Sequence, residues 1–321
     1  MNEIALKKVL MGKRGVFFTL ISLTLVAILL VIFARNLSAV RDTESTAARI
    51  RSIDSFLKDV ESSYLPLSAR ASGYRAVLAT TQYLNSTQQY IAFPQSELGG
   101  VLINGTLTSG QVMTENTLSN FTSHIMDVAK EAYAIDLYVV LNGAQVGQTS
   151  PWQIEIEVNV SILARADVGN WSRDATIRTQ IPIAGFLDPQ YLIRTGSYGQ
   201  PISQSNISNG QWNISVLDSF ISEGRYLHVE GSDAPSFLER FKESPEPSEC
   251  CGIESTINPE MISPSNQQES YADYQFWASS EECADLYTIS GGNFSHTAFK
   301  FDFSHVILYN VSAYAEPLSC P

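Results

Sequence analysis

The chain has few basic residues for its length. Its 321 residues hold 20 lysines and arginines against 33 aspartates and glutamates. Five of the basic residues occur by Arg35, together with one acidic residue, Glu3. The remainder therefore carries 15 basic and 32 acidic residues, a net charge of −17. A surface this acidic repels a phosphate backbone, which excludes nucleic acid as a partner.

Local catalytic signatures are absent. There is no Gly-x-Ser-x-Gly, His-Glu-x-x-His, phosphate-binding loop or EF-hand pattern. His124 is expected on a helix, as a hydrogen-bonded or solvent-facing residue rather than a ligand, and His228 stands apart. His296 and His305 each follow a serine, but we expect both pairs in strands, where adjacent side chains point to opposite faces. We therefore assign no catalytic, cofactor-binding or metal-binding residue, although the paired carboxylates of a glycosidase would leave no local pattern.

Calcium-ligand spacing is also missing. Four carboxylates occur close together in the last quarter, at Asp273, Glu281, Glu282 and Asp285. Because they lack the spacing of a cation loop, we interpret them as part of a solvated surface.

Cysteine is scarce and confined to the last quarter, at Cys250, Cys251, Cys283 and Cys320. No Cys-x-x-Cys spacing occurs, which disfavours zinc. An even number in an exported chain predicts two disulfides, with three connectivities open. Among these we disfavour a Cys250–Cys251 bond, because adjacent residues pair only with backbone strain.

One apolar run is long. Val16–Ala34 contains nineteen residues without a charge, Pro, Gly, Asn or Gln. As a helix it would extend about 28 Å, close to the hydrocarbon thickness of a bilayer. It predicts a transmembrane helix rather than a core helix, which would keep a polar face. Basic residues precede it, so residues 1–15 are expected in the cytoplasm. The length of the run and the missing small-x-small site disfavour a cleaved secretory signal.

Asn-x-Ser/Thr sequons are frequent after this run. Ten of the sixteen asparagines begin one, against about three expected from the Ser and Thr content. They predict glycan acceptors on an exported surface, so the chain from about Asn36 onward is expected to be an extracellular ectodomain. Asn36 itself lies too near the predicted membrane to be used. The candidates are Asn85, Asn104, Asn120, Asn159, Asn170, Asn206, Asn213, Asn293 and Asn310.

Residues 35–90 are expected to form a stalk and a second helix. Apolar residues recur at helical spacing at Ile50, Ile53, Leu57, Val60 and Tyr64. Pro66 is expected to end this helix, and Ser68 to cap the next. The stripe suits either a coiled coil between subunits or packing against the chain's own domain, and we favour the second.

Residues 91–195 are expected to form an α+β head. A hairpin or loop is predicted over 95–110, followed by a helix from Leu118 to Ala132. Alternating apolar residues predict strands over 135–141, 152–162 and 175–183. The expected fold class is α+β, with a transmembrane helix extended into a stalk and helices packed on an antiparallel β-meander.

Residues 196–321 are expected to form a cysteine-containing C-terminal region. A short helix is predicted over 234–242, and a final strand over 299–309. This part shows little continuous apolar core, so it is expected to need disulfides as staples.

Several stretches resemble archaeal pilin-like, membrane-anchored exported proteins with a class III signal, many of them uncharacterised. They are Lys13–Gly15 with its apolar run, Pro151-Trp152, Ile181–Pro189, Ser236–Arg240 and Gly252–Ser255. The resemblance implies that a prepilin peptidase cuts between Gly15 and Val16 and leaves the apolar helix on the mature protein. It also implies a β-rich head assembled at the cell surface, and supplies no catalytic residues. The chain departs from many pilins in lacking a Glu early in the apolar run.

These features predict a single-pass pilin-like or anchored cell-surface glycoprotein with a structural or adhesive role, no enzymatic activity and no cofactor. Its expected partners are the lipid bilayer and either further copies of itself or surface proteins and glycans. One alternative is a membrane-anchored extracellular hydrolase or carbohydrate-active enzyme. Another is a sensor ectodomain acting through a membrane partner, which is disfavoured because only about fifteen residues are expected inside the cell.

Overall fold

The chain has the predicted α+β class, with helices and antiparallel sheets. The computed structural model describes residues 24–32, 44–208, 210–231, 233–262, 269–278 and 285–318. The chain divides into two compact units. One holds residues up to Asp59 together with Ala166–Asn170, and the other holds Val60–Arg165 and Trp171–Pro321.

The first unit contains two helical segments in its described part. Residues 24–32 are helical and exposed, and the remainder of the predicted segment Val16–Ala34 lies outside the described residues. Across the described ranges, no helix combines the length and apolar character needed to cross a membrane. Residues 44–59 are helical too, and Ile53 and Leu57 of the predicted stripe are 1% and 0% exposed, whereas Ile50 is 40% exposed.

The expectation that Pro66 ends a helix is wrong. A π turn, Val60–Tyr64, leads directly into α2, Leu65–Thr87, and Pro66 stands in the first turn of α2. A proline has no backbone N–H to donate. It is tolerated at this position because an N–H in the first turn after the π turn would have no α-helical hydrogen-bond partner. Ser68, predicted as a cap, is instead buried inside α2.

The predicted loop over 95–110 is wrong in its first part. Its place is taken by α3, Pro94–Asn104, which begins at a proline and ends at Gly105 in a left-handed conformation. Helix α3 approaches the sheet closely, since a Cβ atom on Gly99 would lie 2.8 Å from the carbonyl oxygen of Ala144. The predicted hairpin follows, as β1, Thr106–Leu107, paired with β2, Gly110–Gln111.

Helix α4, Leu118–Tyr133, lies where the sequence predicts a helix. Thr117 and Asn120 form a capping box at its start. Leu118 and Ile125 of the predicted apolar face are buried, and Thr122 and Ala129 complete that face.

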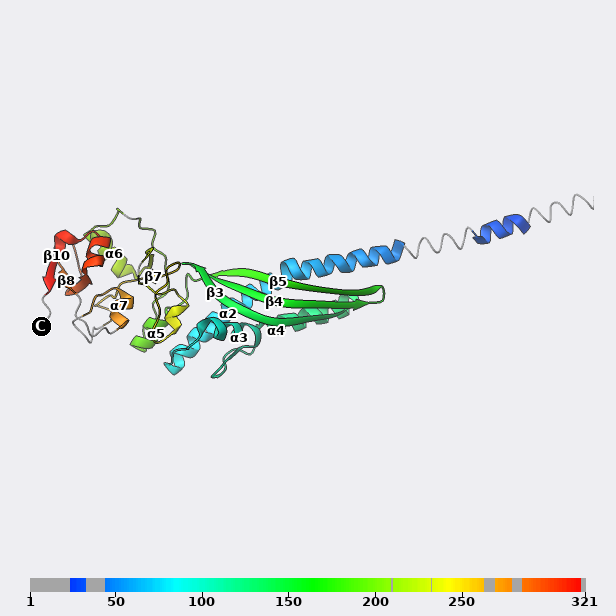
Figure 1. The fold of residues 1–321 in the computed structure, drawn as a ribbon, viewed down its shortest axis with the longest axis horizontal. Helices are drawn as coiled ribbons and strands as arrows, with labels where there is room; N and C mark the ends of the chain where they lie inside the picture. The colour runs from blue at the N-terminus through cyan, green and yellow to red at the C-terminus, as the bar shows by residue number, and fades with distance from the viewer. Residues whose placement is uncertain are drawn as a thin grey trace, which may run out of the picture. The chain divides into compact units, whose positions relative to one another are not determined.

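The largest sheet has three strands in the order β3-β4-β5, with β3 and β4 antiparallel. The strands are β3, Asp136–Ser150, β4, Gln153–Ala166, and β5, Gly169–Pro182. Alternate residues of β4 from Ile154 to Ile162 are at most 1% exposed, as the period of two predicts. Helices α2, α3 and α4 lie along this sheet (Figure 1), and α3 and α4 contact β3.

The C-terminal part is built from short elements. In chain order they are α5, Pro189–Thr195, α6, Ile214–Glu223, β6, Leu227–His228, η2, Glu239–Phe241, β7, Ile253–Glu254, α7, Asp273–Ala278, β8, Leu286–Ile289, β9, Phe299–Asp302, α8, Phe303–Leu308, η3, Ser312–Tyr314, and β10, Ala315–Leu318. Strands β10, β8 and β9 form one antiparallel sheet, and β6 pairs with β7.

Two sequence predictions fail here. The helix predicted over 234–242 is reduced to the 3₁₀ turn η2. The strand predicted over 299–309 stops at Asp302, whose carboxylate accepts hydrogen bonds from the backbone N–H groups of Ser304 and His305 and so caps α8. The alternation of aromatic and polar residues continues past Asp302 and so predicts a longer strand. The cap at Asp302 starts a helix at that point instead.

The C-terminal part also has more core than predicted. Tyr309 packs against Trp212 and Phe301 with ring centroids 4.7 Å and 5.0 Å apart, and Phe299 meets Phe301 at 4.8 Å. Phe299, Phe301 and Tyr309 are each 0% exposed. Aromatic pairs at these separations stabilise a fold beyond the area they bury.

Candidate functional site

A buried arginine organises one group of polar side chains. Arg240 is 0% exposed, and its Nη1 donates to Oδ2 of Asp188 at 2.7 Å and to Oδ2 of Asp273 at 2.8 Å. Its Nη2 donates to the carbonyl oxygen of Ile253. Tyr226 donates its hydroxyl to Asp188 at 2.8 Å. We call Asp188, Tyr226, Arg240 and Asp273 the Arg240 cluster.

The Arg240 cluster is enclosed on all sides. Each of its four residues is 0% exposed, so none of them can contact a dissolved substrate. Burial raises the pKa of Asp273 to about 6, although the guanidinium of Arg240 opposes that rise. Burial lowers the pKa of Arg240, but the two facing carboxylates outweigh it and hold this pKa above its ordinary value. The cluster is therefore a structural ion network that joins α5, η2 and α7.

The interpretation of Asp273 as a solvated carboxylate is wrong, because it serves as a counter-ion in the interior. Asp285 is exposed, as that interpretation requires. Glu281 and Glu282 lie outside the described residues.

A second enclosed group surrounds His305. Its Nδ1 lies 2.5 Å from Oδ2 of Asp302, and its Nε2 lies 3.5 Å from Oε2 of Glu254. Tyr309 donates its hydroxyl to Oε1 of Glu254 at 2.9 Å. We call Glu254, Asp302, His305 and Tyr309 the His305 cluster.

Two carboxylates flank one imidazole in the His305 cluster. Burial lowers the pKa of His305, but Asp302 and Glu254 outweigh it and raise that pKa to about 10. Conversely, burial raises the pKa of Asp302, but His305 and Ser304 outweigh it and bring that pKa below its usual range. The imidazole is therefore a buried cation between two anions at neutral pH.

The expectation that the side chains of Ser304 and His305 point to opposite faces is wrong, because it assumed a strand at these residues. Both residues lie on α8, and Oγ of Ser304 reaches within 3.5 Å of Nδ1 of His305. The main partner of each is Asp302, which accepts hydrogen bonds from both side chains. This arrangement holds the imidazole in place and leaves the hydroxyl bonded to a carboxylate.

The disfavoured Cys250–Cys251 bond is present. The segment turns tightly here, because the N–H of Gly252 donates to the carbonyl oxygen of Ser248 and the N–H of Ser248 donates to that of Ala234. Gly252 lies directly against the carbonyl of Ala234, with no room for a Cβ atom. This turn brings two adjacent side chains to one side, which an extended chain would not do. Cys283 and Cys320 lie outside the described residues.

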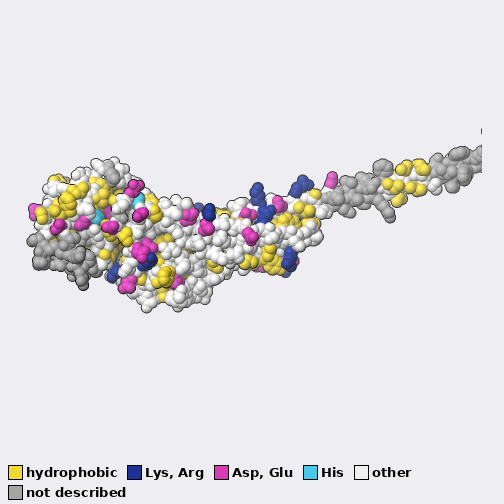
Figure 2. All heavy atoms as spheres, in the orientation of Figure 1, with side chains coloured by type: hydrophobic (Ala, Val, Ile, Leu, Met, Phe, Trp, Pro, Cys, Tyr) yellow, Lys and Arg dark blue, Asp and Glu magenta, His cyan; other side chains and the backbone are white. Residues whose placement is uncertain are grey.

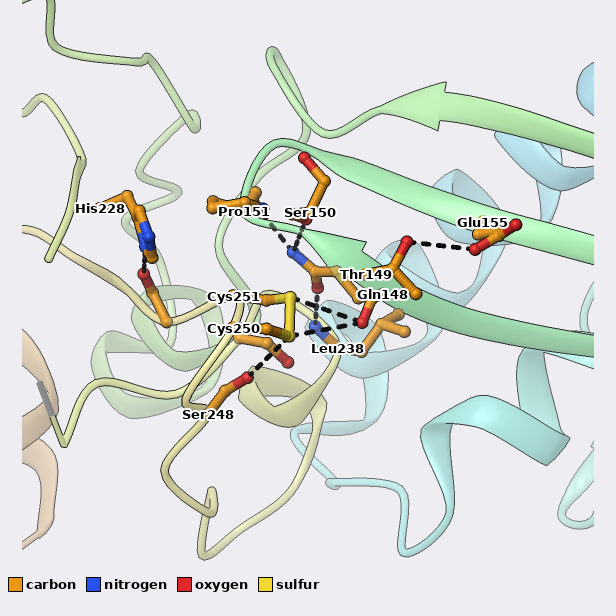
Figure 3. Close-up of a disulfide and its surroundings, with 12 residues drawn as sticks. Gln148, Thr149, Ser150, Pro151, Glu155, His228, Leu238, Ser248, Cys250 and Cys251 are labelled. Carbon is orange, nitrogen blue, oxygen red and sulfur yellow. Dashed lines mark hydrogen bonds between the residues drawn. A yellow bond between two sulfur atoms is a disulfide. The ribbon is translucent and has the colours of Figure 1, made fainter. Parts of the chain in front are cut away.

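The disulfide packs on the hairpin between β3 and β4. Figure 3 shows both sulfur atoms facing the carbonyl oxygen of Gln148, at 3.8 Å from Cys250 and 3.5 Å from Cys251. A disulfide sulfur carries no hydrogen, so these are packing contacts. The side chain of Gln148 donates to the carbonyls of Ser150 and Pro151 and accepts from the N–H of Leu238. Gln148 therefore links the hairpin to the C-terminal part.

An open cavity of about 240 Å³ lies elsewhere in the C-terminal part. Its apolar wall comes from Tyr191, Pro201, Ile221, Met261 and Ile262. Ser222 and Asn258 are among the polar residues that line it. Ser222 is exposed at the carboxyl end of α6.

His296 lies beside this cavity, behind Ser222. Its Nε2 lies 3.2 Å from Oγ of Ser222, although 74 residues separate the two in sequence. The imidazole is buried, with its side chain 2% exposed, and Oε1 of Glu260 is 3.7 Å from its Nδ1. Asp218 stands one turn before Ser222 on α6, with Oδ1 3.9 Å from Nε2. We call Ser222, Glu260 and His296 the Ser222 group.

The nine described sequon asparagines are all exposed, and they lie on α2, α3, α4, β4 and β5 and in the C-terminal part. Asn159 lies on the polar face of β4, where its Oδ1 accepts from Thr176 at 2.9 Å. Asn213 caps α6. In each of these two cases the side-chain oxygen is bonded, which leaves the amide nitrogen as the atom that a glycan would modify.

Other predicted features are placed in part. Gly15, Val16 and Asn36 lie outside the described residues, and His124 is exposed on α4. On the face shown in Figure 2, acidic side chains are scattered among uncharged ones rather than gathered in one patch. Within the described ranges, no three His, Cys, Asp or Glu side chains come close enough together to hold a metal ion.

Sequence reasoning missed all three groups of polar side chains. A signal existed for one of them, because Asp188 and Arg240 each interrupt an apolar stretch, as in Phe237-Leu238-Glu239-Arg240-Phe241. These residues also fall within the stretches that carried the family resemblance. No local pattern could have joined Ser222 to His296, because their contact depends on the tertiary fold.

Comparison of the chain with protein-family models, with curated proteins and with solved structures finds no match.

Proposed function

We propose that this chain is a membrane-anchored, pilin-like cell-surface glycoprotein with a structural or adhesive role. The observation that carries the proposal is the exposure of all nine described sequon asparagines. An oligosaccharide must stay in solvent, so one buried acceptor would have counted against the proposal. The oxidised Cys250–Cys251 pair agrees with an exported compartment.

The proposed topology follows from the charges at the N-terminus. Residues 1–15 stay in the cytoplasm, 16–34 span the bilayer, and 35–90 provide the stalk and second helix. The ectodomain begins at about Asn36. Beyond the stalk and second helix it consists of an α+β head, residues 91–195, with helices packed on an antiparallel β-meander, and of the C-terminal region, residues 196–321. The ectodomain meets other copies of itself or surface proteins and glycans.

Glycopeptide mass spectrometry of protein from its native membrane tests the proposal. We expect glycan masses on several of the nine sequon asparagines. Asn116 and Asn142 are exposed but lie outside sequons, so they provide matched controls and should carry none. In intact cells, external protease should remove a C-terminal tag without permeabilisation. Unmodified sequons together with a protected tag would refute the proposal.

Cleavage between Gly15 and Val16 would distinguish a filament subunit from a static membrane anchor. If the prepilin-type cut occurs, the intact mass should correspond to a chain that starts at Val16 and keeps its apolar helix. Gly15→Leu should then leave the precursor uncut, because it replaces the residue directly before the predicted cut with a much bulkier one. A mature chain that starts at Met1 would remove the filament-subunit form and leave a static anchor.

A further inference from the structure

The Ser222 group has the order of contacts found in serine hydrolases. A hydroxyl meets one imidazole nitrogen at 3.2 Å, and a carboxylate oxygen stands 3.7 Å from the other. Serine, histidine and acid in this order form a nucleophile, a general base and an orienting group on many unrelated folds. The three residues come from α6, from the segment after β7 and from the loop before β9.

The tautomer of His296 follows from its neighbours. Its Nδ1 is buried without a hydrogen-bond partner among the described atoms, and the nearest acidic oxygen belongs to Glu260. A proton on Nδ1 therefore points toward that carboxylate. The lone pair of Nε2 is then directed at the Ser222 hydroxyl, as a general base requires.

Two carboxylates stand near the ring of His296. Asp218 and Glu260 place carboxylate oxygens 3.9 Å and 3.7 Å from its two ring nitrogens. The carboxyl end of α6 adds a partial negative charge beside Ser222. The Ser295 N–H and hydroxyl donate to Oδ1 of Asp218 at 2.7 Å and 2.8 Å, which fixes that carboxylate next to the imidazole.

A donor for a developing oxyanion must come from another residue of the cavity lining, because the carboxyl end of a helix presents carbonyl oxygens rather than N–H groups. Asn258 lines the same cavity as Ser222. Its side-chain oxygen accepts from the N–H of Glu260 at 2.9 Å, which turns its amide NH₂ toward other acceptors. An amide at this position can serve as an oxyanion donor.

We propose that the Ser222 group hydrolyses small uncharged carboxylic esters in the adjoining cavity. Ser222 Oγ attacks the ester carbonyl as its proton passes to His296 Nε2. The C–O bond to the alcohol then breaks, and the alcohol leaves with that proton. Water, activated by the same nitrogen, cleaves the acyl-serine to release the carboxylic acid and regenerate Ser222. Ser222 and His296 are the catalytic residues, and Glu260 is a positioning residue.

The cavity defines the substrate class. Its volume of about 240 Å³ is below the roughly 300–1,000 Å³ of pockets that hold drug-sized ligands. Its wall is mainly apolar, and the described residues that line it include no lysine or arginine to bind an anionic substrate. A short acyl chain such as acetyl or butanoyl fits these limits. This activity goes beyond the surface-glycoprotein proposal and does not depend on it.

The test uses the full-length chain in detergent with p-nitrophenyl acetate and a fluorophosphonate probe. We expect ester hydrolysis and a probe adduct on the peptide containing Ser222. Ser222→Ala should remove the adduct and lower kcat/KM roughly 1,000-fold. Ser219→Ala provides the matched control, since Ser219 is exposed on the same helix and its hydroxyl donates to the Ser215 carbonyl. It should change the rate less than about twofold.

Further outcomes decide the proposal. Glu260→Gln should lower kcat about tenfold with KM unchanged, the pattern of a group that acts in the transition state. The decanoate ester should react much more slowly than the acetate. Hydrolysis that persists in Ser222→Ala, an adduct on another residue, or no hydrolysis above buffer would each overturn the proposal.

Discussion

Arg240→Met is expected to destabilise the protein by about 3–5 kcal/mol, because it leaves two carboxylates buried without their counter-ion. Asp188 and Asp273 both lie within 2.8 Å of the guanidinium, and all three side chains are 0% exposed. The free energy of unfolding can be measured by urea titration of the full-length chain in detergent, followed by tryptophan fluorescence.

Arg178→Met is the matched control. Arg178 also bonds a carboxylate at 2.8 Å, that of Glu157, but its side chain is 67% exposed. An exposed pair contributes about 0–1 kcal/mol. Equal losses from the two substitutions would show that burial of the Arg240 cluster has no energetic effect.

The pH dependence of Arg240→Met follows from Asp273. A carboxyl whose folded pKa is raised gives its full stability below its unfolded pKa, near 4, and loses it as the pH rises through the folded value. That folded pKa is already about 6 with Arg240 present, and removing the cation raises it further. The difference between variant and wild type should therefore shrink as the pH falls from 8 to 5.

His305→Gln is expected to cost on the order of 3 kcal/mol near pH 7, and the loss should diminish as the pH rises toward 10. The pKa of His305 is raised to about 10. Its stabilisation is therefore fully present below its unfolded pKa of about 6.5 and lost as the pH rises through the folded value. Urea titrations at pH 6, 8 and 10 measure the difference between variant and wild type.

His124→Gln controls for the substitution itself, because His124 is exposed on α4. A surface change of this kind is expected to stay within about 0.5 kcal/mol. A constant difference between His305→Gln and wild type from pH 6 to pH 10 would contradict the ionic account of the His305 cluster.

Periodicity predicted the elements that bury a continuous apolar face. The alternation along β4 and the helical spacing of Leu118 and Ile125 reflect burial directly, so both were recovered. The secondary-structure predictions were wrong where one local contact outweighs the hydrophobic pattern. Asp302 starts a helix inside an aromatic alternation, and the π turn before α2 lets Pro66 enter a helix.

The polar groups lay beyond this reasoning for a different reason. Composition identifies charged residues as surface residues by default, whereas Arg240 and Glu254 are stabilised by partners that only the tertiary fold supplies. Ser222 and His296 are ordinary residues in their local sequence. Their chemistry arises from the meeting of a helix end and a distant loop.

The Cys250–Cys251 bond bears on what holds the C-terminal part together. A disulfide stabilises a fold mainly by reducing the conformational entropy of the unfolded chain. This contribution grows with the number of residues between the two cysteines. A bond between neighbours in sequence encloses almost none. This bond therefore hardly restricts the unfolded chain, and the described residues of this part are held by other contacts, among them the packed aromatic rings and the buried charged side chains.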